Sequence, residues 1–401
     1  MQKIYFILLL TALLLSNKIC LPQYNYVPNP SFETLYACPT FGNQIDSAVG
    51  WHTPINGGGG NPDIFHVCCT NPSICGVPSQ TAFHTYQNPH NGNGYAGIDA
   101  DCGSISNFRE YIQSKLITRL STGHIYCVKF YVSLFDINKS YIKTLGAYFD
   151  NGSVSAPSHF GLATVTPQVY NATQPLNDTI NWMMIEGSFV ATGNEEYITI
   201  GNFFPDSASG IGFFSAPPPP YWNSYYYIDD VSVIDGGLPA FAGNDTVIYP
   251  GDSVFIGRQP EIGLDEDCIW RLGELNIDTV AGMWVKPDST TTYILQQTIC
   301  GNVTYDTITV HVWYTGIEDY ANSKGITVFP NPASQTLTIS GKTEITQLII
   351  TDMLGNVVIQ QQAHEHAATI DVGRLTNGIY FISVIDANGN VYNPKKIIII
   401  K

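Results

Sequence analysis

The stretch HIYCVKFYVSLF, His124 to Phe135, decides the fold class of this 401-residue chain. Apolar residues occupy every second position, which is the period of a β-strand rather than of a helix. One face carries Tyr126, Val128, Phe130, Val132 and Leu134, and the other carries Cys127, Lys129, Tyr131 and Ser133. The first set is expected to face a core. Cys127 then lies on the outer face, where it can bridge to a covering loop.

The same alternation recurs from Tyr24 to the end of the chain, and no segment keeps a helical period over three turns. We therefore predict an all-β protein built of several sandwiches. The stretches GGLPAFAG (236–243) and YTGIEDYANSKG (314–325) have linker composition. They divide the chain into residues 24–236, 240–313 and 318–401, and the second part has the size of a small immunoglobulin-like sandwich.

Charge restricts the possible partners. The chain has 17 Lys and Arg residues against 33 Asp and Glu residues, a formal net charge of −16. Such a surface repels phosphate backbones and anionic membranes, so nucleic acid is excluded as a partner. The apolar content of 44% supports substantial cores.

The N-terminus, MQKIYFILLLTALLLSNKIC, has Lys3 before an apolar run from Ile4 to Leu15. This pattern predicts a secretory signal peptide over residues 1–20. No other segment is long and apolar enough to span a bilayer, so the exported protein is not expected to be transmembrane.

Eight cysteines remain once Cys20 is removed with the signal, and an even number in an exported chain favours disulfides. Cys268 and Cys300, alone in the second part, are predicted to pair. The pairing of the other six is left open: Cys38, Cys68, Cys69, Cys75, Cys102 and Cys127. A zinc site formed by His66, Cys68, Cys69 and Cys75 is the alternative for that segment.

The last part contains ITVFPNPASQTLTISG, then ITQLIITDMLGNVVIQQ, then LTNGIYFISVIDANGNVYNPKKIIIIK. Its marks are Phe329-Pro330-Asn331-Pro332, the turn from Asp352 to Asn356, and LTNGIY from Leu375 to Tyr380. Over its full length it resembles the C-terminal type A sorting domain of proteins exported by the type IX secretion system of Bacteroidota. The resemblance implies passage through the periplasm, engagement of the outer-membrane translocon, and secretion or attachment at the cell surface.

The second part contains AGNDTVIYPGDSVFIG, CIW and TTYILQQ. These stretches resemble the polycystic-kidney-disease-like and immunoglobulin-like spacer modules of bacterial surface proteins. The resemblance implies that the second part is a small immunoglobulin-like β-sandwich with Trp270 in its core. A second small sandwich of this kind is expected for the sorting domain.

The first part opens with YNYVPNPSFE and closes with YYYIDDVSVID, and REYIQSKLITRLSTGHIYCVKFYVSLF lies between them. These segments resemble the jelly-roll carbohydrate-binding modules of bacterial xylanases and cellulases, and galactose-binding-like domains more widely. A jelly roll brings its first and last strands together, so Glu33 would meet Asp229 and Asp230. The resemblance implies a structural calcium ion there, which would relieve the repulsion between carboxylates by taking oxygen ligands.

Strand alternation places Tyr227, Asp229, Val231 and Val233 on one face, and Ile228, Asp230, Ser232 and Ile234 on the other. Asp229 and Glu33 are therefore the first candidates for calcium, and Asp230 the second. A pair of solvated or turn-capping aspartates is the structural alternative.

Modules of this kind bind sugars through exposed aromatic faces flanked by polar side chains. The candidates here are Trp51, Tyr95, Tyr111, Trp182, Tyr221 and Trp222, with Arg109 as a hydrogen-bonding partner. The loop APPPPYWNSYYY is the most site-like cluster, because a stiff polyproline segment ending in Tyr221 and Trp222 is unfavourable to expose without a use. The insertion GGGGNPDIFHVCCTNPSICG departs from the family and is expected to cover or replace the usual groove.

Three functions follow as hypotheses. The first is binding of extracellular polysaccharide or a surface glycan without chemistry, and the second is a structural adhesin or matrix protein with protein partners. The third is a glycan hydrolase, although no G-x-S-x-G elbow or H-E-x-x-H motif is present. Such a hydrolase would need two carboxylates, and the sequence does not single out any pair among the candidates. That set is Asp63, Asp99, Asp101, Glu110 and Asp136.

Overall fold

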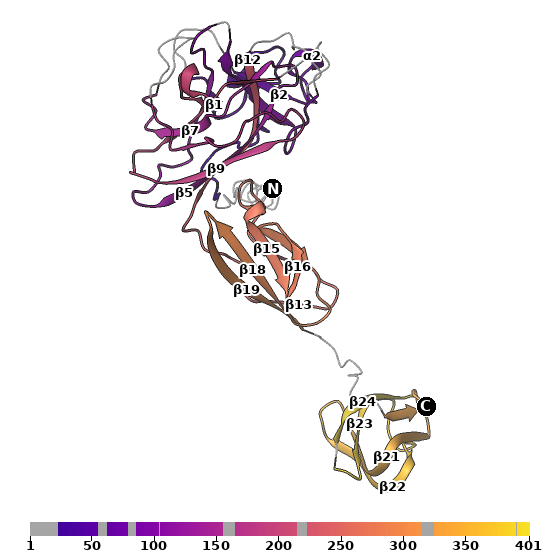
Figure 1. The fold of residues 1–401 in the computed structure, drawn as a ribbon. Helices are drawn as coiled ribbons and strands as arrows, with labels where there is room; N and C mark the ends of the chain where they lie inside the picture. Colours follow the sequence, from indigo (N-terminus) through magenta and orange to yellow (C-terminus); the bar gives the residue numbers. More distant parts are fainter. Residues whose placement is uncertain are drawn as a thin grey trace, which may run out of the picture. The chain divides into compact units, whose positions relative to one another are not determined.

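The computed structural model describes residues 23–54, 62–78, 86–103, 105–154, 165–214, 223–313, 325–389 and 391–401. The expected signal peptide of residues 1–20 and the candidates Tyr221 and Trp222 lie outside the described residues. Strands dominate every part of the described chain (Figure 1), so the all-β prediction is confirmed. The chain divides into two compact units, residues 1–312 and 313–401.

The first part, here called the head, contains two five-stranded antiparallel sheets. One has the strand order β1-β4-β10-β7-β8, and the other β2-β3-β12-β5-β9. The strands of the first sheet are β1 (Trp51–His52), β4 (Tyr111–Lys115), β7 (Leu145–Asp150), β8 (Val169–Tyr170) and β10 (Tyr197–Asn202). Those of the second are β2 (Asp63–His66), β3 (Gly94–Cys102), β5 (Ile125–Leu134), β9 (Met183–Val190) and β12 (Asn223–Asp235). A short pair, β6 (Ser140–Tyr141) and β11 (Gly212–Phe213), and the turns η1 (Ile45–Ser47), α2 (Pro72–Cys75) and η2 (Asp206–Ala208) complete the head.

The alternation in β5 sets one wall of the core, as predicted. Val128 and Phe130 are fully buried in one cluster with Ile112 of β4 and Ile198 of β10, so the two sheets pack face to face. Cys127 lies on the opposite face of β5 and belongs to a different cluster.

The alternation in β12 breaks at Asp230, and the predicted faces of that strand are wrong. Asp230 has a φ of 49°, and the register with β5 shifts between Asp229 and Ser232. This β-bulge adds one residue, so the inward side chains are Ile228 before it and Val231 after it. Asp229 therefore shares the outer face with Tyr227 and not with the two valines.

The middle part has a five-stranded sheet, β13-β19-β18-β15-β16, and a two-stranded sheet, β14-β17. Trp270 is fully buried in their shared core, and its Nε1 donates to the carbonyl of Val280 at 2.8 Å. The strands and the single turn are β13 (Thr246–Ile248), β14 (Val254–Gly257), η3 (Asp265–Asp267), β15 (Cys268–Leu272), β16 (Leu275–Asp278), β17 (Gly282–Val285), β18 (Thr291–Ile299) and β19 (Asn302–Val312).

The predicted Cys268–Cys300 disulfide is wrong, because Cys300 is bonded to Cys127 of the head and Cys268 is a buried thiol. Cys268 is the first residue of β15 and lies opposite Gln297. Cys300 follows Gln297 by three residues and therefore lies roughly 10 Å beyond the end of β15. This distance exceeds the Cα separation of a disulfide.

Residues 325–401 form a separate unit around one sheet, β20-β21-β23-β24, with β22 also paired to β21. Register shifts interrupt β21 between Ser340 and Gln347. Leu337 before these shifts and Leu348 after them belong to the same buried cluster, so the sheet closes around its own core. The strands are β20 (Ile326–Phe329), β21 (Thr336–Thr351), β22 (Val357–Asp371), β23 (Gly378–Asp386) and β24 (Val391–Ile399).

Candidate functional site

The outer face of the second head sheet is aromatic, but a loop covers it. Phe65, Tyr95 and Tyr227 form a cluster there, and all three are buried. Residues 86–93, here called the strap, lie across this face: the Tyr95 hydroxyl donates to the carbonyl of Gln87 at 3.0 Å. The Gln87 side chain is buried and accepts a hydrogen bond from Ser133 at 3.1 Å. These tyrosines therefore cannot stack on a sugar.

Three of the predicted aromatic ligand-binding residues are core residues. Trp51 is buried and donates from Nε1 to the carbonyl of Asn29, and Tyr111 is buried with its hydroxyl on the carbonyl of Asn202. Tyr95 lies under the strap. Their hydrogen-bonding groups are satisfied internally, as expected for large aromatic side chains in a core.

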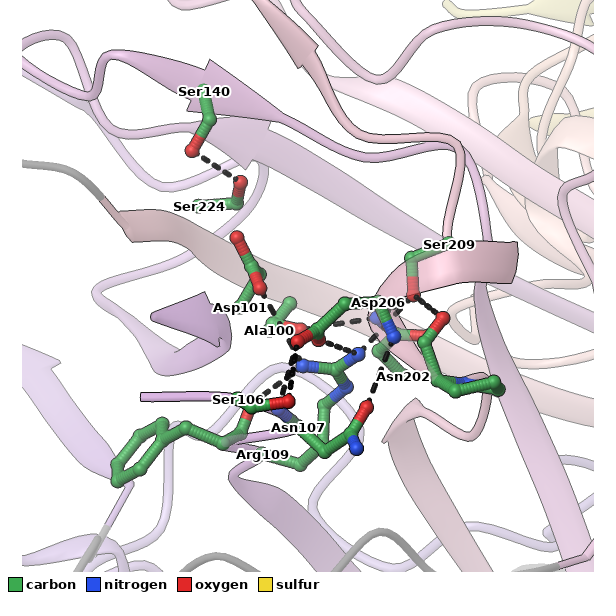
Figure 2. A network of polar contacts seen from close by, with 12 residues as sticks. Ala100, Asp101, Ser106, Asn107, Arg109, Ser140, Asn202, Asp206, Ser209 and Ser224 are labelled. Carbon is green, nitrogen blue, oxygen red and sulfur yellow. Dashed lines mark hydrogen bonds and ion pairs between the residues drawn. The ribbon is translucent and has the colours of Figure 1, made fainter. Parts of the chain in front are cut away.

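Arg109 holds two loops together and is not a ligand contact (Figure 2). Its side chain is 0% exposed. Its guanidinium donates to the carbonyl of Phe204 at 2.7 Å and to Oδ1 of Asp206 at 2.9 Å. Ser106 and the backbone of Asn107 donate to the other oxygen of Asp206. The network ties the segment before β4 to the turn after β10, so the prediction that Arg109 meets a ligand is wrong.

Trp182 is the one described aromatic candidate that lines a groove. It is half-buried, and its Nε1 donates to the carbonyl of Asn88 at 3.1 Å. The groove beside it has a volume of about 610 Å³, within the usual range of ligand sites. The residues lining this Trp182 groove are Tyr86, Gln87, Asn88, Pro89, His90, Asp136, Thr179, Ile180, Asn181 and Trp182.

Tyr86 and Asp136 are functional candidates that the sequence did not single out as ligand contacts. Tyr86 is 57% exposed, and its backbone N–H donates to Oδ2 of Asp136 at 2.9 Å. Partial burial raises the pKa of Asp136, and this hydrogen bond lowers it in part. The strap, the end of β5 and the loop before β9 meet only in the folded head. The spacing of residues in the sequence therefore does not indicate that Tyr86 and Asp136 lie beside Trp182.

Three carboxyl groups from the hydrolase candidates, half-buried Asp63 and Asp99 and buried Glu110, lie near one another in the head. Asp63 accepts from the Tyr225 hydroxyl at 2.5 Å, and Glu110 accepts from the backbone N–H of Asp99 at 2.8 Å. Burial raises the pKa of Asp99 to about 7, and burial with the charge of Asp99 raises that of Glu110. The three groups are desolvated and hydrogen-bonded within the head, and none is among the described residues that line the groove beside Trp182.

The carboxylates predicted to bind calcium are only partly brought together. Asp229 accepts from the Ser31 hydroxyl at 3.0 Å and the backbone N–H of His90 at 2.9 Å. Asp230 Oδ2 lies 2.5 Å from Nδ1 of the same histidine, so the bulge directs both aspartates to His90. Glu33 instead accepts from the backbone N–H groups of Asn93 and Gly94. Across the described ranges, no three His, Cys, Asp or Glu side chains are grouped so that they could hold a metal ion.

The cysteines of the insertion are paired, which excludes the zinc alternative. Cys38 is bonded to Cys68, and Cys69 to Cys75. Thiolates are the ligands that such a zinc site requires, and a disulfide removes them. The two bonds fix the loops that precede the strap.

Residues 327–400 match the family model described as the secretion system C-terminal sorting domain. The chain ends in a secretion-system sorting domain. This domain indicates export, either to the cell surface or into the medium, as predicted from the sequence. Within the described residues, no helix is long and apolar enough to cross a membrane.

A curated relative is an endo-acting ulvan lyase of Formosa agariphila, 37% identical over 75 residues. That match covers 18% of this chain and 14% of the lyase, so the chain spans a small fraction of its length. Among solved structures, the CBM22-1 xylan-binding domain of Paenibacillus barcinonensis Xyn10C has a TM-score of 0.28 at 11% identity, covering 51% of this chain and 90% of that one. PorZ of Porphyromonas gingivalis has a TM-score of 0.17 at 12% identity, covering 37% and 29%. These structural likenesses concern the β-sandwich fold alone.

Proposed function

We propose that the head of this exported protein binds a polysaccharide chain in the Trp182 groove without chemical turnover. The observation that carries the proposal is the composition of the groove. An indole and a phenol ring, Trp182 and Tyr86, stand beside the side chains of Asn88, Asn181 and Asp136. Aromatic faces suit the C–H faces of sugar rings, and amide and carboxyl groups suit their hydroxyls.

Binding rather than hydrolysis fits the distribution of carboxyl groups. Glycoside hydrolysis needs two carboxyl groups about 5 to 10 Å apart on either side of the scissile bond. Among the described residues that line the groove, Asp136 is the single carboxyl group. Asp63, Asp99 and Glu110 are buried or hydrogen-bonded elsewhere and do not line it.

Affinity electrophoresis of the full chain against a panel of soluble polysaccharides tests this function. Trp182→Ala and Tyr86→Ala are each expected to weaken retardation by roughly two- to tenfold, since a stacked aromatic ring contributes about 0.5 to 1.5 kcal/mol. Trp284→Ala removes an equally bulky ring that is 71% exposed on the middle part and serves as the matched control. Retardation that survives both groove substitutions, in variants with an unchanged melting temperature, would refute the assignment.

A protein-binding adhesin is the second candidate, and a different surface favours it. Tyr36, Phe41, Val67 and Ile74 are exposed apolar side chains next to the two disulfides of the insertion. Rigid loops with exposed apolar groups are typical of protein contacts. If Tyr36→Ser and Phe41→Ser abolish cell attachment while Trp182→Ala does not, adhesion through protein is the better function.

We also propose that a calcium ion stabilises the head at Asp229 and Asp230. Oδ1 of Asp230 is buried and has no hydrogen-bond partner in the described structure, as expected of an oxygen suited to a cation. The carbonyl of Asn91 and the hydroxyl of Ser31 are hydrogen-bonded together beside Asp229 and supply further oxygens. Calcium accepts such a set together with water. Glu33 is not included in this site, because its carboxylate accepts hydrogen bonds from the backbone N–H groups of Asn93 and Gly94.

A further inference from the structure

The described residues that line the Trp182 groove include no Lys or Arg. Their polar groups are side-chain amides, two hydroxyls, an indole N–H, an imidazole and the carboxyl group of Asp136. The imidazole of His90 is engaged at Nδ1 by Asp230. A groove built for a carboxylate or sulfate would be expected to supply Arg or Lys, which bind such anions through charge-assisted hydrogen bonds.

This lack of cationic groups follows from the sequence of the strap. No Asp, Glu, Lys or Arg occurs between Asp63 and Asp99, and this charge-free stretch supplies the groove wall from Tyr86 to His90. The opposite wall, Thr179 to Trp182, is also uncharged. The chain as a whole carries a formal charge of −16. Among the described lining residues, Asp136 therefore contributes the one carboxylate charge, beside His90, which is already paired with Asp230.

Within the described part of the chain, Asp136 accepts a hydrogen bond through one of its two carboxyl oxygens and leaves the other for a ligand. Its Oδ2 accepts from the backbone N–H of Tyr86 at 2.9 Å, which fixes the carboxyl group to the strap. Its other oxygen, Oδ1, accepts no hydrogen bond from the described residues. A carboxylate oxygen directed at a groove accepts hydrogen bonds from hydroxyl groups and is repelled by other anions.

We propose that the Trp182 groove selects uncharged polysaccharides and rejects those carrying carboxylate or sulfate groups, with Asp136 as the residue that determines this selectivity. The inference rests on the proposed function, because it names the class of glycan for the same groove. In this role Asp136 accepts hydrogen bonds from sugar hydroxyls and places a negative charge where an anionic substituent would lie.

The test compares polymers that share a backbone and differ in charge. The probes are hydroxyethyl-cellulose with carboxymethyl-cellulose, methyl-esterified with de-esterified polygalacturonate, and dextran with dextran sulfate. Affinity electrophoresis or titration calorimetry of the full chain is done at low and high salt, about 20 and 500 mM, since salt screens exposed charges. At low salt the uncharged polymer of a pair is expected to bind at least about tenfold more tightly than the anionic one. The ratio of the two affinities should decrease at high salt.

Asp136→Asn keeps the shape and the hydrogen bond from Tyr86 while removing the charge. It is expected to reduce the uncharged-to-anionic ratio by roughly threefold or more, with the affinity for the uncharged polymer changed less. Asp46→Asn is the matched control, because Asp46 is an exposed carboxylate of the head that does not line the groove.

Two kinds of failure can be told apart. If the anionic member of a pair binds as tightly as the uncharged one, or if Asp136→Asn leaves the ratio unchanged, the selectivity is refuted while the groove remains a glycan site. If no polymer binds, or if binding survives Trp182→Ala and Tyr86→Ala, the proposed function itself fails and the inference fails with it.

Discussion

Asp99 and Glu110 are the residues through which pH is expected to act on the stability of the head. Burial raises the pKa of Asp99 to about 7, against 3.8 for an exposed aspartate. The folded head therefore holds a proton that the unfolded chain releases above about pH 4. This stabilisation is complete below pH 4 and is lost as the pH rises through 7.

Urea unfolding of the head at pH 5 and pH 8 measures this effect. The free energy of unfolding is expected to fall by more than about 1 kcal/mol between the two, by the linkage between pKa and stability. Asp99→Asn keeps an oxygen that can accept the hydrogen bond from Asn223 and should flatten the dependence. The measurement is made with chelator present. If the free energy of unfolding of the wild-type protein rises from pH 5 to pH 8, the burial of Asp99 and Glu110 is contradicted.

Cys268 provides a chemical test of the disulfide arrangement. Burial raises the pKa of its thiol to about 12, so the thiolate that reacts with alkylating reagents is scarce in the folded protein. Iodoacetamide is expected to leave Cys268 unlabelled in the native protein and to label it after unfolding without reductant. Peptide mapping by mass spectrometry reads out both states. A Cys268 that labels only after reduction would show that it is in a disulfide.

At the scale of elements, the strands β5 and β12 show what periodicity can and cannot predict. In β5 the alternation holds over the whole strand, so its inward and outward residues were correct from sequence. In β12 the bulge at Asp230 inverts the alternation, and Asp229 and Asp230 both reach His90. Nothing in the letters YYYIDDVSVID marks the extra residue, because the bulge forms through pairing with β5 and contact with the N-terminal segment.

The candidate site was predictable only in part for the same reason. Three of the four aromatic candidates that the structure describes are core residues, because a Trp or Tyr in a strand serves packing as well as binding. Trp182 could be named in advance, and it lines the groove. Tyr86 and Asp136 become partners of Trp182 only when the strap crosses the sheet, which is a tertiary event without a local signal.

The bulge of β12 is also where removal of calcium should act. Chelation by EGTA is expected to lower the melting temperature of the head by several degrees, because two neighbouring carboxylates then lose their cation. Asp230→Asn removes the charge of the carboxyl group whose buried Oδ1 has no hydrogen-bond partner among the described residues, and it should abolish the response to added calcium. Glu33→Gln is the informative comparison. It should destabilise the end of the strap, yet the melting temperature should still rise on addition of calcium. A head whose melting temperature is the same with calcium and with EGTA holds no ion at this bulge.

At the scale of the whole molecule, the first 312 residues form one compact unit because head and middle part share strong contacts. The carboxylate of Glu261 accepts hydrogen bonds from the backbone N–H groups of Tyr24 and Asn25, both at 2.9 Å. Lys129 of β5 pairs with Asp267 at 2.5 Å. The Cys127–Cys300 disulfide closes a separation of 173 residues, which by loop entropy stabilises the folded unit by roughly 5 kcal/mol. The middle part is therefore more than a flexible spacer.

These contacts predict that head and middle part unfold together. Scanning calorimetry of the full chain should show one transition for both, beside that of the sorting domain. In the double variant Cys300→Ser with Glu261→Ala the shared transition is expected to split in two, because the covalent link and two charge-assisted hydrogen bonds, each about 1.5 to 3 kcal/mol, are lost. Glu266→Ala, an exposed carboxylate of the same loop, is the control and should leave a single transition. Two separate transitions already in the wild-type protein would show that the contacts do not couple the two folds, and the middle part would then return to the role of a simple spacer.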